Sequence, residues 1–209
     1  MNSLLLAVLL AAVVIAWATS LLVAKVPLTI ALMKPITWAF TAMGVAAFAF
    51  DRWIWRLPFL YPQLVRVPDL QGTWKGQVIS NWIDPATGSK KPPIEAFLAI
   101  RQTYFSIHMR LITKESQSHI LAGKIFCNVD ETCEIAGIFR NTPRMTSRDV
   151  SPIHNGGVLL RVQGDSRFTL EGDYWTDRDT KGELRFTEKA KDVFHDFERA
   201  AVGRYESQL

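Results

Sequence analysis

The segment that decides the fold is residues 168–174, which read FTLEGDY. Apolar or small residues alternate there with polar or charged ones, which is the pattern of a β-strand with one buried face. The same period of two runs through residues 105–111, FSIHMRL, and through residues 183–186, ELRF. The polar part of the chain is therefore predicted to consist of half-buried strands.

Counting such runs and the turn residues between them gives eight predicted strands after residue 70. Gly164-Asp165 lies between two of them and is a tight-hairpin signal. Eight sequential antiparallel strands predict an all-β domain, an eight-stranded antiparallel up-and-down β-barrel, with a two-sheet sandwich as the alternative. A helical period appears at residues 188–201, where we expect a closing helix. The predicted strands cover residues 72–80, 94–101, 104–113, 118–128, 133–141, 156–163, 167–175 and 182–187.

Charge is distributed unevenly along the 209 residues. Residues 1–65 contain four basic residues and one acidic residue, whereas residues 66–209 contain 20 basic and 19 acidic residues. An apolar head on a polar body is typical of a membrane anchor joined to one domain. The small net charge of the body argues against a surface that coats DNA or RNA.

The apolar head is predicted to form two transmembrane helices within residues 1–56. Residues 4–24 carry no charge, and their number matches the roughly 20 residues that a helix needs to cross a bilayer. A secretory signal has basic residues in front of its apolar part, and residues 1–3 contain none. A second pass is predicted over residues 30–50, the alternative being a buried apolar segment. Three prolines make residues 57–69 a stiff neck, and residues 70–209 are the predicted barrel domain.

Basic residues beside the two predicted passes indicate the orientation of the protein. The flank after the second pass carries Arg52, Arg56 and Arg66, and the connecting loop carries Lys25 and Lys34. Because the larger number faces the cytoplasm in most membrane proteins, the barrel domain is predicted to be cytoplasmic.

The two cysteines, Cys127 and Cys133, are six residues apart across an expected hairpin turn. They are placed either to form a disulfide or to remain reduced in a cytosolic domain. We expect reduced thiols, because nothing else marks the body as exported. Without further cysteines, a zinc site is not expected.

The sequence contains no motif of a common catalytic class: GxSxG, HExxH, the P-loop and GxGxxG are all missing. The four histidines, His108, His119, His154 and His195, do not have the spacing of metal ligands. We therefore expect a protein that is not an enzyme and that needs no cofactor or metal.

Tyr174, Thr176, Arg178 and Thr180 recur at a spacing of two, so in an extended chain their side chains point to one side. An aromatic ring, two hydroxyls and a guanidinium suit a nucleobase that stacks and a phosphate that needs donors. The alternative is that only Tyr174 lies in the strand and that the others form a loop.

Two further groups of polar residues lie near predicted strand ends. Arg140 and Asn141 end the fifth predicted strand, and the arginines after them suit either a phosphate or a solvated connection. His154 precedes Gly156-Gly157, where two glycines allow either the close approach of a ligand or a β-bulge.

Several short motifs, in their order and spacing, are shared with a known family. They are Gly72-Thr73-Trp74-Lys75-Gly76, Ser116-Gln117-Ser118, Asn141-x-Pro143, His154-x-Gly156 and Gly172-x-Tyr174-x-Thr176-x-Arg178-x-Thr180-x-Gly182. With the two predicted passes in front of them, the chain resembles the two-transmembrane, β-strand-rich effectors of bacterial cyclic-oligonucleotide-based antiphage signalling systems (CBASS). The opening Gly-x-Trp is also similar to the start of lipocalin and other calycin barrels, where the tryptophan closes one end.

The resemblance implies an antiphage defence effector whose barrel binds a cyclic dinucleotide, made by a synthase that is its functional partner. Ligand binding then promotes self-association, and the transmembrane helices disrupt the lipid bilayer of the bacterial inner membrane and kill the infected cell. Phe139 departs from the family pattern, because a tyrosine is expected two residues before the asparagine. The resemblance places at the ligand pocket Tyr174, Thr176, Arg178 and Thr180, with Arg140, Asn141 and His154 as further candidates.

A function of a different class remains as an alternative. A membrane-tethered, calycin-like carrier of an apolar small molecule would have the same architecture. That carrier needs an apolar lumen, whereas a nucleotide receptor needs arginine at its pocket, so the two hypotheses differ in what Arg178 does.

Overall fold

The computed structural model describes residues 11–16, 18–19, 33–83, 88–128, 130, 132–164 and 167–209. The chain divides into two compact units, Met1–Arg66 and Val67–Leu209. The boundary falls inside the predicted neck.

In the first unit, α2 (Met33–Arg52) forms a helix over most of the predicted second pass. Two short 3-10 helices follow it, η1 (Ile54–Arg56) and η2 (Pro58–Leu60). Within the described residues, no helix combines the length and the hydropathy needed to cross a membrane. The predicted first pass, residues 4–24, lies largely outside the described part of the chain. Within this range the structure describes residues 11–16 and 18–19, which are helical.

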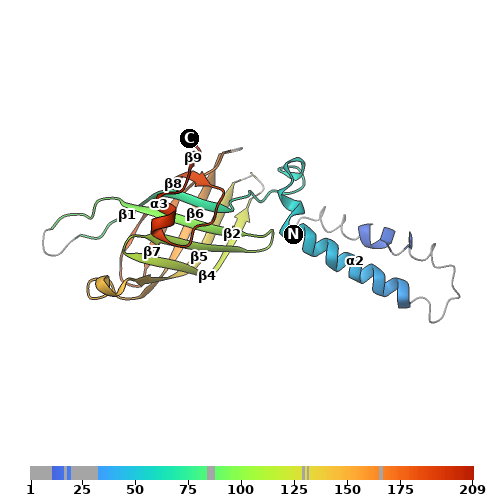
Figure 1. Ribbon diagram of the computed structural model, residues 1–209, viewed down its shortest axis with the longest axis horizontal. Coiled ribbons are helices and arrows are strands. Elements are labelled where there is room, and N and C mark those ends of the chain that lie inside the picture. The colour runs from blue at the N-terminus through green and yellow to red at the C-terminus, as the bar shows by residue number, and fades with distance from the viewer. Residues whose placement is uncertain are drawn as a thin grey trace. The chain divides into compact units, whose positions relative to one another are not determined.

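The second unit is a closed antiparallel barrel (Figure 1). Each strand pairs with the next one along the chain, and β1 also pairs with β8, so the eight strands form a continuous wall. The predicted eight-stranded barrel is thus confirmed. The strands are β1 (Gly72–Ser80), β2 (Ile94–Gln102), β3 (Ile107–Thr113), β4 (Ser116–Cys127), β5 (Cys133–Pro143), β6 (His154–Gln163), β7 (Thr169–Thr176) and β8 (Lys181–Ala190), and a short β9 (Glu206–Ser207) pairs with β8.

The C-terminal part of the barrel differs from the sequence-based expectation. The helix predicted over residues 188–201 is wrong at its start, because β8 continues to Ala190 and pairs there with Thr73 of β1. Only α3 (Phe197–Ala201) is helical, and the Asp196 side chain caps it by accepting a hydrogen bond from the Arg199 amide at 2.8 Å. Pairing with β1 therefore outweighs the local helical preference.

Closure of the barrel depends on a glycine at the seam between β1 and β8. The register of the two strands shifts between Lys75 and Gly76. A Cβ atom at Gly76 would overlap the carbonyl oxygen of Arg185 and would lie 2.7 Å from the Cα atom of Phe186. Since any side chain would force these strands apart, glycine permits the close approach that the seam requires.

One end of the barrel interior is filled and sealed by side chains. Trp74 is fully buried among core residues, and its indole nitrogen donates to the Leu70 carbonyl oxygen at 2.8 Å. The buried Gln102 side chain accepts from the Leu70 amide at 2.8 Å and donates to the Pro68 carbonyl oxygen at 2.9 Å. These hydrogen bonds hold the segment that leads into β1 across this end of the barrel.

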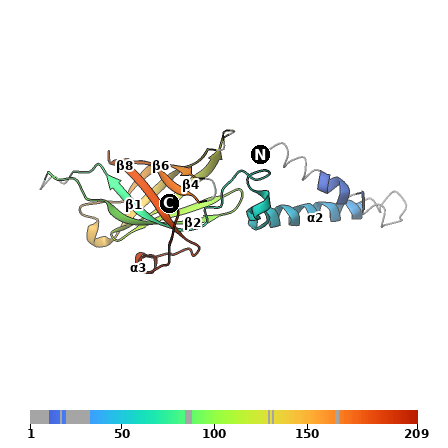
Figure 2. The ribbon, with the colours of Figure 1, turned by 90° about the horizontal axis from the view of Figure 1, so that it is seen from above.

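The C-terminal segment covers an apolar part of the outer wall. Phe97, Ala99 and Ile112 of β2 and β3 form a second buried cluster with Ala200 of α3. Figure 2 shows α3 outside the barrel wall. The Thr73 hydroxyl accepts from the Phe194 amide at 2.9 Å and donates to a carbonyl oxygen at 2.8 Å. The tail is therefore part of the fold of the barrel domain.

Cys127 and Cys133 form a disulfide, so the expectation of reduced thiols is wrong. The two residues face each other as a register pair of β4 and β5, with their Cα atoms 4.1 Å apart. Cross-strand pairing brings the sulfur atoms within bonding reach, and the cysteines no longer support a cytosolic location.

Replacing Trp74 with alanine should lower the free energy of unfolding of the barrel by roughly 3–5 kcal/mol, because a fully buried aromatic side chain is lost and a cavity remains. Trp175→Ala is the control, since Trp175 is 54% exposed. Urea unfolding of the full chain, followed by circular dichroism, measures both. Equal losses would show that Trp74 does not seal the barrel.

Candidate functional site

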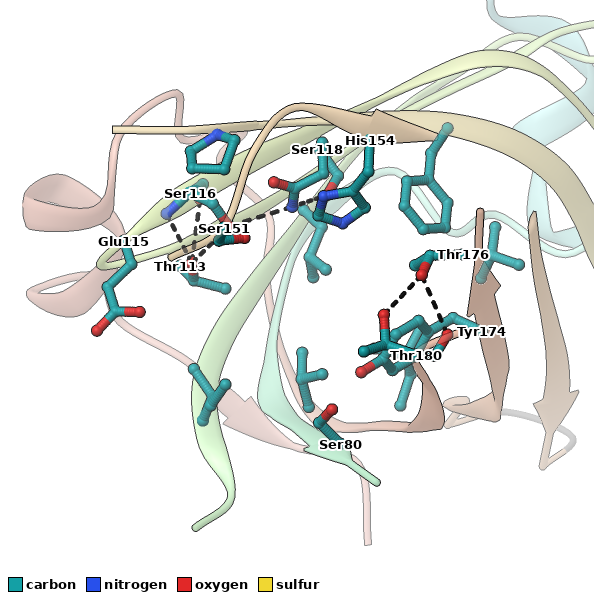
Figure 3. A pocket seen from close by; sticks show the side chains of 18 of the residues that line it. Ser80, Thr113, Glu115, Ser116, Ser118, Ser151, His154, Tyr174, Thr176 and Thr180 are labelled. Carbon is teal, nitrogen blue, oxygen red and sulfur yellow. Dashed lines mark hydrogen bonds between the residues drawn. The ribbon is translucent and has the colours of Figure 1, made fainter. Parts of the chain in front are cut away.

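A cavity of about 230 Å³ lies at the end of the barrel opposite Trp74 (Figure 3). Its rim comes from the ends of strands and from the connections β1–β2, β3–β4, β5–β6 and β7–β8, which all lie at this end. The barrel interior is therefore divided into a filled half and a hollow half. An eight-stranded barrel is wide enough to hold one small ligand in this way.

The floor of the cavity is apolar. It is formed by inward-facing residues from the middle of the strands: Leu98, Met109, Val158, Leu160 and Leu184. These positions belong to the same buried core as Trp74. A ligand that enters the cavity can therefore bury an apolar surface, or the face of a ring, against this floor.

One wall carries an aromatic hydroxyl and two threonines (Figure 3). Burial raises the pKa of Tyr174 above its usual value, an effect that a hydrogen bond with Ser80 partly opposes. The Tyr174 hydroxyl is therefore neutral at physiological pH and keeps its proton for donation. The Thr176 and Thr180 hydroxyl oxygens are 2.6 Å apart, so these two residues act as one hydrogen-bonding unit.

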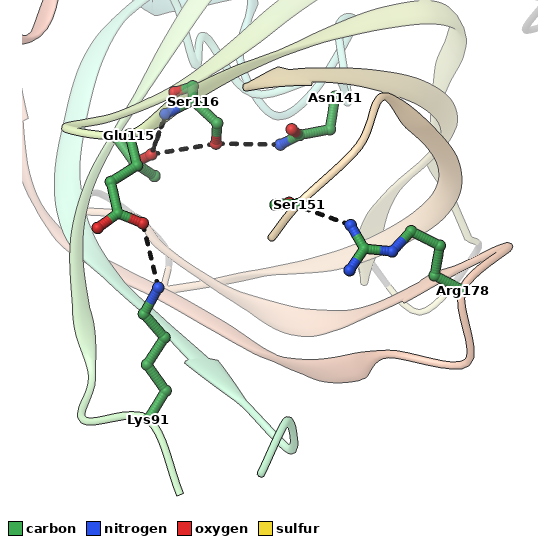
Figure 4. A network of polar contacts seen from close by, with 7 residues as sticks. Lys91, Glu115, Ser116, Asn141, Ser151 and Arg178 are labelled. Carbon is green, nitrogen blue, oxygen red and sulfur yellow. Dashed lines mark hydrogen bonds and ion pairs between the residues drawn. The ribbon is translucent and has the colours of Figure 1, made fainter. Parts of the chain in front are cut away.

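Arg178 brings a positive charge to the mouth of the cavity. Its Nη1 donates to the Ser151 hydroxyl at 3.0 Å (Figure 4). The same nitrogen lies 3.4 Å from Nδ1 of His154. Among the described residues, Arg178 forms no ion pair with a carboxylate. Its Nη1 atom is thus held by the Ser151 hydroxyl and the Pro152 carbonyl oxygen, and its charge remains available to an anion.

A polar network lies on the opposite wall, on β4 and β5. The Asn141 side-chain amide donates to the hydroxyls of Ser116, at 3.1 Å, and Ser118, at 2.8 Å. The Asn141 Oδ1 atom is buried and has no hydrogen-bond partner in the described part of the chain. A buried polar atom without a partner is costly, so this oxygen is an acceptor that the described residues leave unused.

An ion pair crosses part of the rim. Lys91, which precedes β2, lies 3.1 Å from the Glu115 carboxylate in the β3–β4 turn (Figure 4). The pair is largely exposed and contributes little to stability. It reduces the positive charge that Lys91 offers to a ligand, so Arg178 is the main cation that the described lining presents.

Six of the seven predicted site residues line the cavity: Tyr174, Thr176, Arg178, Thr180, Asn141 and His154. The exception is Arg140, which is exposed and donates to the Asn155 side chain at 3.2 Å. Because side chains alternate along a strand, Arg140 and its neighbour Asn141 cannot both face the interior. We therefore place Arg140 on the outer wall.

The route by which Arg178 and Thr180 reach the cavity differs from the expected extended chain. β7 ends at Thr176, and residues 177–180 form a turn in which Asp179 has a φ of 58°. Ser151 and Lys91 were missed by the sequence reasoning, because their positions depend on the long connections β5–β6 and β1–β2 rather than on a local period.

A family model described as Cap15, cyclic dinucleotide receptor domain, matches residues 65–188. A comparison with curated proteins found no match. The matched segment contains every residue that lines the cavity, and it confirms the resemblance to CBASS effectors for the barrel domain. Because the match extends over more than half of the chain, this chain belongs to the Cap15 cyclic dinucleotide receptor domain family.

Proposed function

We propose that the hollow half of the barrel binds a cyclic dinucleotide and that binding triggers self-association of the protein in the bacterial inner membrane. The observation that carries this proposal is Arg178, a cation without a described carboxylate partner at the mouth of a cavity. The family match supports it independently, since the matched domain is a cyclic dinucleotide receptor.

The chemistry of the lining divides the ligand into parts. Arg178, with the hydroxyls of Thr176 and Thr180, holds a phosphate through charge-assisted and neutral hydrogen bonds. The neutral Tyr174 ring offers a face on which a base stacks. Asn141, with its unpartnered oxygen, pairs with the polar edge of a base, while the apolar floor excludes water from these contacts.

Self-association follows from linkage if the ligand binds the assembled form more tightly than the free form. At a hundredfold excess over Kd, such a ligand shifts the equilibrium by about 2.7 kcal/mol. Assembly gathers the N-terminal helices in one patch of bilayer, and we propose that this clustering disrupts the membrane. The exposed Trp38, Phe40 and Phe48 of α2 provide apolar surface for a lipid environment.

The proposed location is the inner membrane with the barrel domain in the cytoplasm, where a nucleotide synthase would release its product. The supporting observation is the charge asymmetry beside the predicted passes. Reduced cysteines would have supported the same location, but Cys127 and Cys133 form a disulfide and give it no support.

The apolar floor favours a second candidate, the carrier of an apolar small molecule. Such a carrier would keep its affinity when Arg178 is replaced, because its ligand makes no ionic contact. A fluorescent fatty acid, titrated into the wild-type chain and the Arg178→Ala variant, tests this alternative. Equal and saturable binding by both proteins would favour the carrier.

Arg178→Ala should weaken cyclic dinucleotide binding about 10- to 100-fold, since a hydrogen bond to a charged group contributes roughly 1.5–3 kcal/mol. Isothermal titration calorimetry of the full chain in detergent, against a panel of cyclic dinucleotides, measures this loss. The matched control is Arg185→Ala, an exposed arginine that pairs with Glu171 at 3.1 Å outside the cavity. A similar loss in both variants, or none in either, would contradict the assignment of Arg178.

Vesicles loaded with a self-quenching dye and carrying the full chain should release the dye when the binding cyclic dinucleotide is added. Vesicles that carry Arg178→Ala should stay intact at a ligand concentration just above the Kd of the wild type, because the weakened variant is then largely unliganded. Intact wild-type vesicles under saturating ligand would overturn the membrane-disruption step while leaving the receptor assignment standing.

A further inference from the structure

Three basic side chains lie next to one another on the outer wall of the barrel. Arg110 of β3 pairs in register with His119 of β4, and His119 pairs with Arg140 of β5. Ser118 and Asn141, the neighbours of His119 and Arg140 along their strands, line the cavity, so alternation turns the three basic residues outward. We call Arg110, His119 and Arg140 the basic row.

The basic row brings side chains of like charge directly opposite each other, an arrangement that destabilises a sheet. Elsewhere on the outer wall, charged side chains of neighbouring strands form ion pairs, such as Arg185 with Glu171 at 3.1 Å and Arg161 with Asp173 at 3.5 Å. Among the described residues, no ion pair includes a member of the basic row. The cost of placing these charges together is therefore not offset by an ion pair within the described barrel.

The described surroundings of His119 supply no carboxylate. The C-terminal segment covers part of β2 and β3, and its carboxylates Asp196 and Glu198 are already paired with Arg199 and Arg144. Apart from the two arginines, the register gives His119 these outward-facing neighbours on β3, β4 and β5: His108, Ile112, Gln117, Leu121, Ile138 and Thr142. A counter-charge for the row therefore has to come from a bound anion.

Arg140 is held in position by a chain of hydrogen bonds. Its Nε atom donates to the Asn155 side-chain oxygen at 3.2 Å. Asn155 is itself fixed by Asp177, because its backbone amide and its side-chain amide donate to the same carboxylate oxygen at 3.0 and 3.4 Å. Within the described structure, Arg140 thus uses only Nε, and its two terminal nitrogens are left to donate to a ligand.

We propose that the basic row binds a phosphate group on the outer wall of the barrel. The guanidinium groups of Arg110 and Arg140 approach it from β3 and β5, and His119 lies between them on β4. With strands about 4.8 Å apart, the two arginines start roughly 10 Å from each other, which long side chains can span together. A phosphate group offers three acceptor oxygens and up to two negative charges, so it can contact all three side chains, whereas a carboxylate has only two oxygens.

The titration of His119 agrees with this assignment. Loss of hydration on the wall and the charge of Arg110 lower the pKa of His119 below its usual value. A bound phosphate opposes the effect of Arg110 and raises the pKa. Protonation of His119 and binding of the phosphate therefore favour each other, so the affinity for phosphate increases as the imidazole becomes charged.

Histidine NMR of the full chain in a non-ionic detergent tests the site. The chain has four histidines, and the His119→Gln variant identifies the imidazole signal that belongs to His119. We expect inorganic phosphate, exchanged for chloride at constant ionic strength, to raise the pKa of His119 in a saturable way. Arg110→Ala should raise that pKa even without phosphate, because the neighbouring positive charge is lost.

Variants of the row test which side chains hold the phosphate. Arg140→Ala and Arg110→Ala should each weaken phosphate binding at His119 by about tenfold or more, since each removes hydrogen bonds to a charged group. Asn155→Ala should weaken it severalfold and leave the pKa of His119 without phosphate unchanged, because it releases Arg140 without removing a charge. The matched control is Arg161→Ala, an outer-wall arginine that is already paired with Asp173; it should keep the wild-type affinity within twofold.

Nanodiscs of phosphatidylcholine, prepared with and without phosphatidic acid, distinguish the sources of the phosphate. A response of His119 to phosphatidic acid but not to inorganic phosphate assigns a lipid headgroup, and a response to inorganic phosphate assigns a soluble ligand. No response to either, or equal weakening by Arg161→Ala, would overturn the proposal. Arg178→Ala should not change phosphate binding at His119, so the basic row stands or falls independently of the proposed function of the cavity.

Discussion

The hydrogen-bonded seam between β1 and β8 is the constraint on which the rest of this molecule depends. Closure removes the free edges of the sheet and gives every strand a fixed inside and outside. Gly76 makes the seam close enough, because no Cβ stands between it and the Arg185 carbonyl group. Once the wall is closed, the period of two along each strand decides which side chains reach the interior.

The barrel interior then divides into a filled end and a hollow end according to the size of the side chains that face it. Trp74 and the polar contacts of Gln102 fill and seal one end, so the other end can remain hollow without loss of the core. The hollow end has short turns as well as long connections, and these bring Arg178 and Ser151 together. The sealed half, with its filled core, thus supports a hollow half that is lined by polar groups.

The barrel could be predicted from the sequence because strand alternation and turn residues are local signals. The spacing of two also placed Tyr174 and Thr176 on one side of the chain, and both line the cavity, whereas Asn141, which also lines it, was a candidate through the family resemblance. Arg140 was expected at the cavity but does not line it, because side chains alternate along a strand and only one of two neighbouring residues can face the interior. The disulfide and the extension of β8 required the register between strands, which depends on contacts distant in sequence.

The division of the barrel into a sealed end and a ligand end has a consequence for how such receptors diversify. Residues 144–153 belong to no wall strand, so insertions or deletions there leave the pairings of β5 with β6 unchanged. Changes in this connection alter the groups that hold Arg178 and leave the Trp74 plug intact. A lineage confronted with new messengers can therefore remodel recognition while it inherits the same wall.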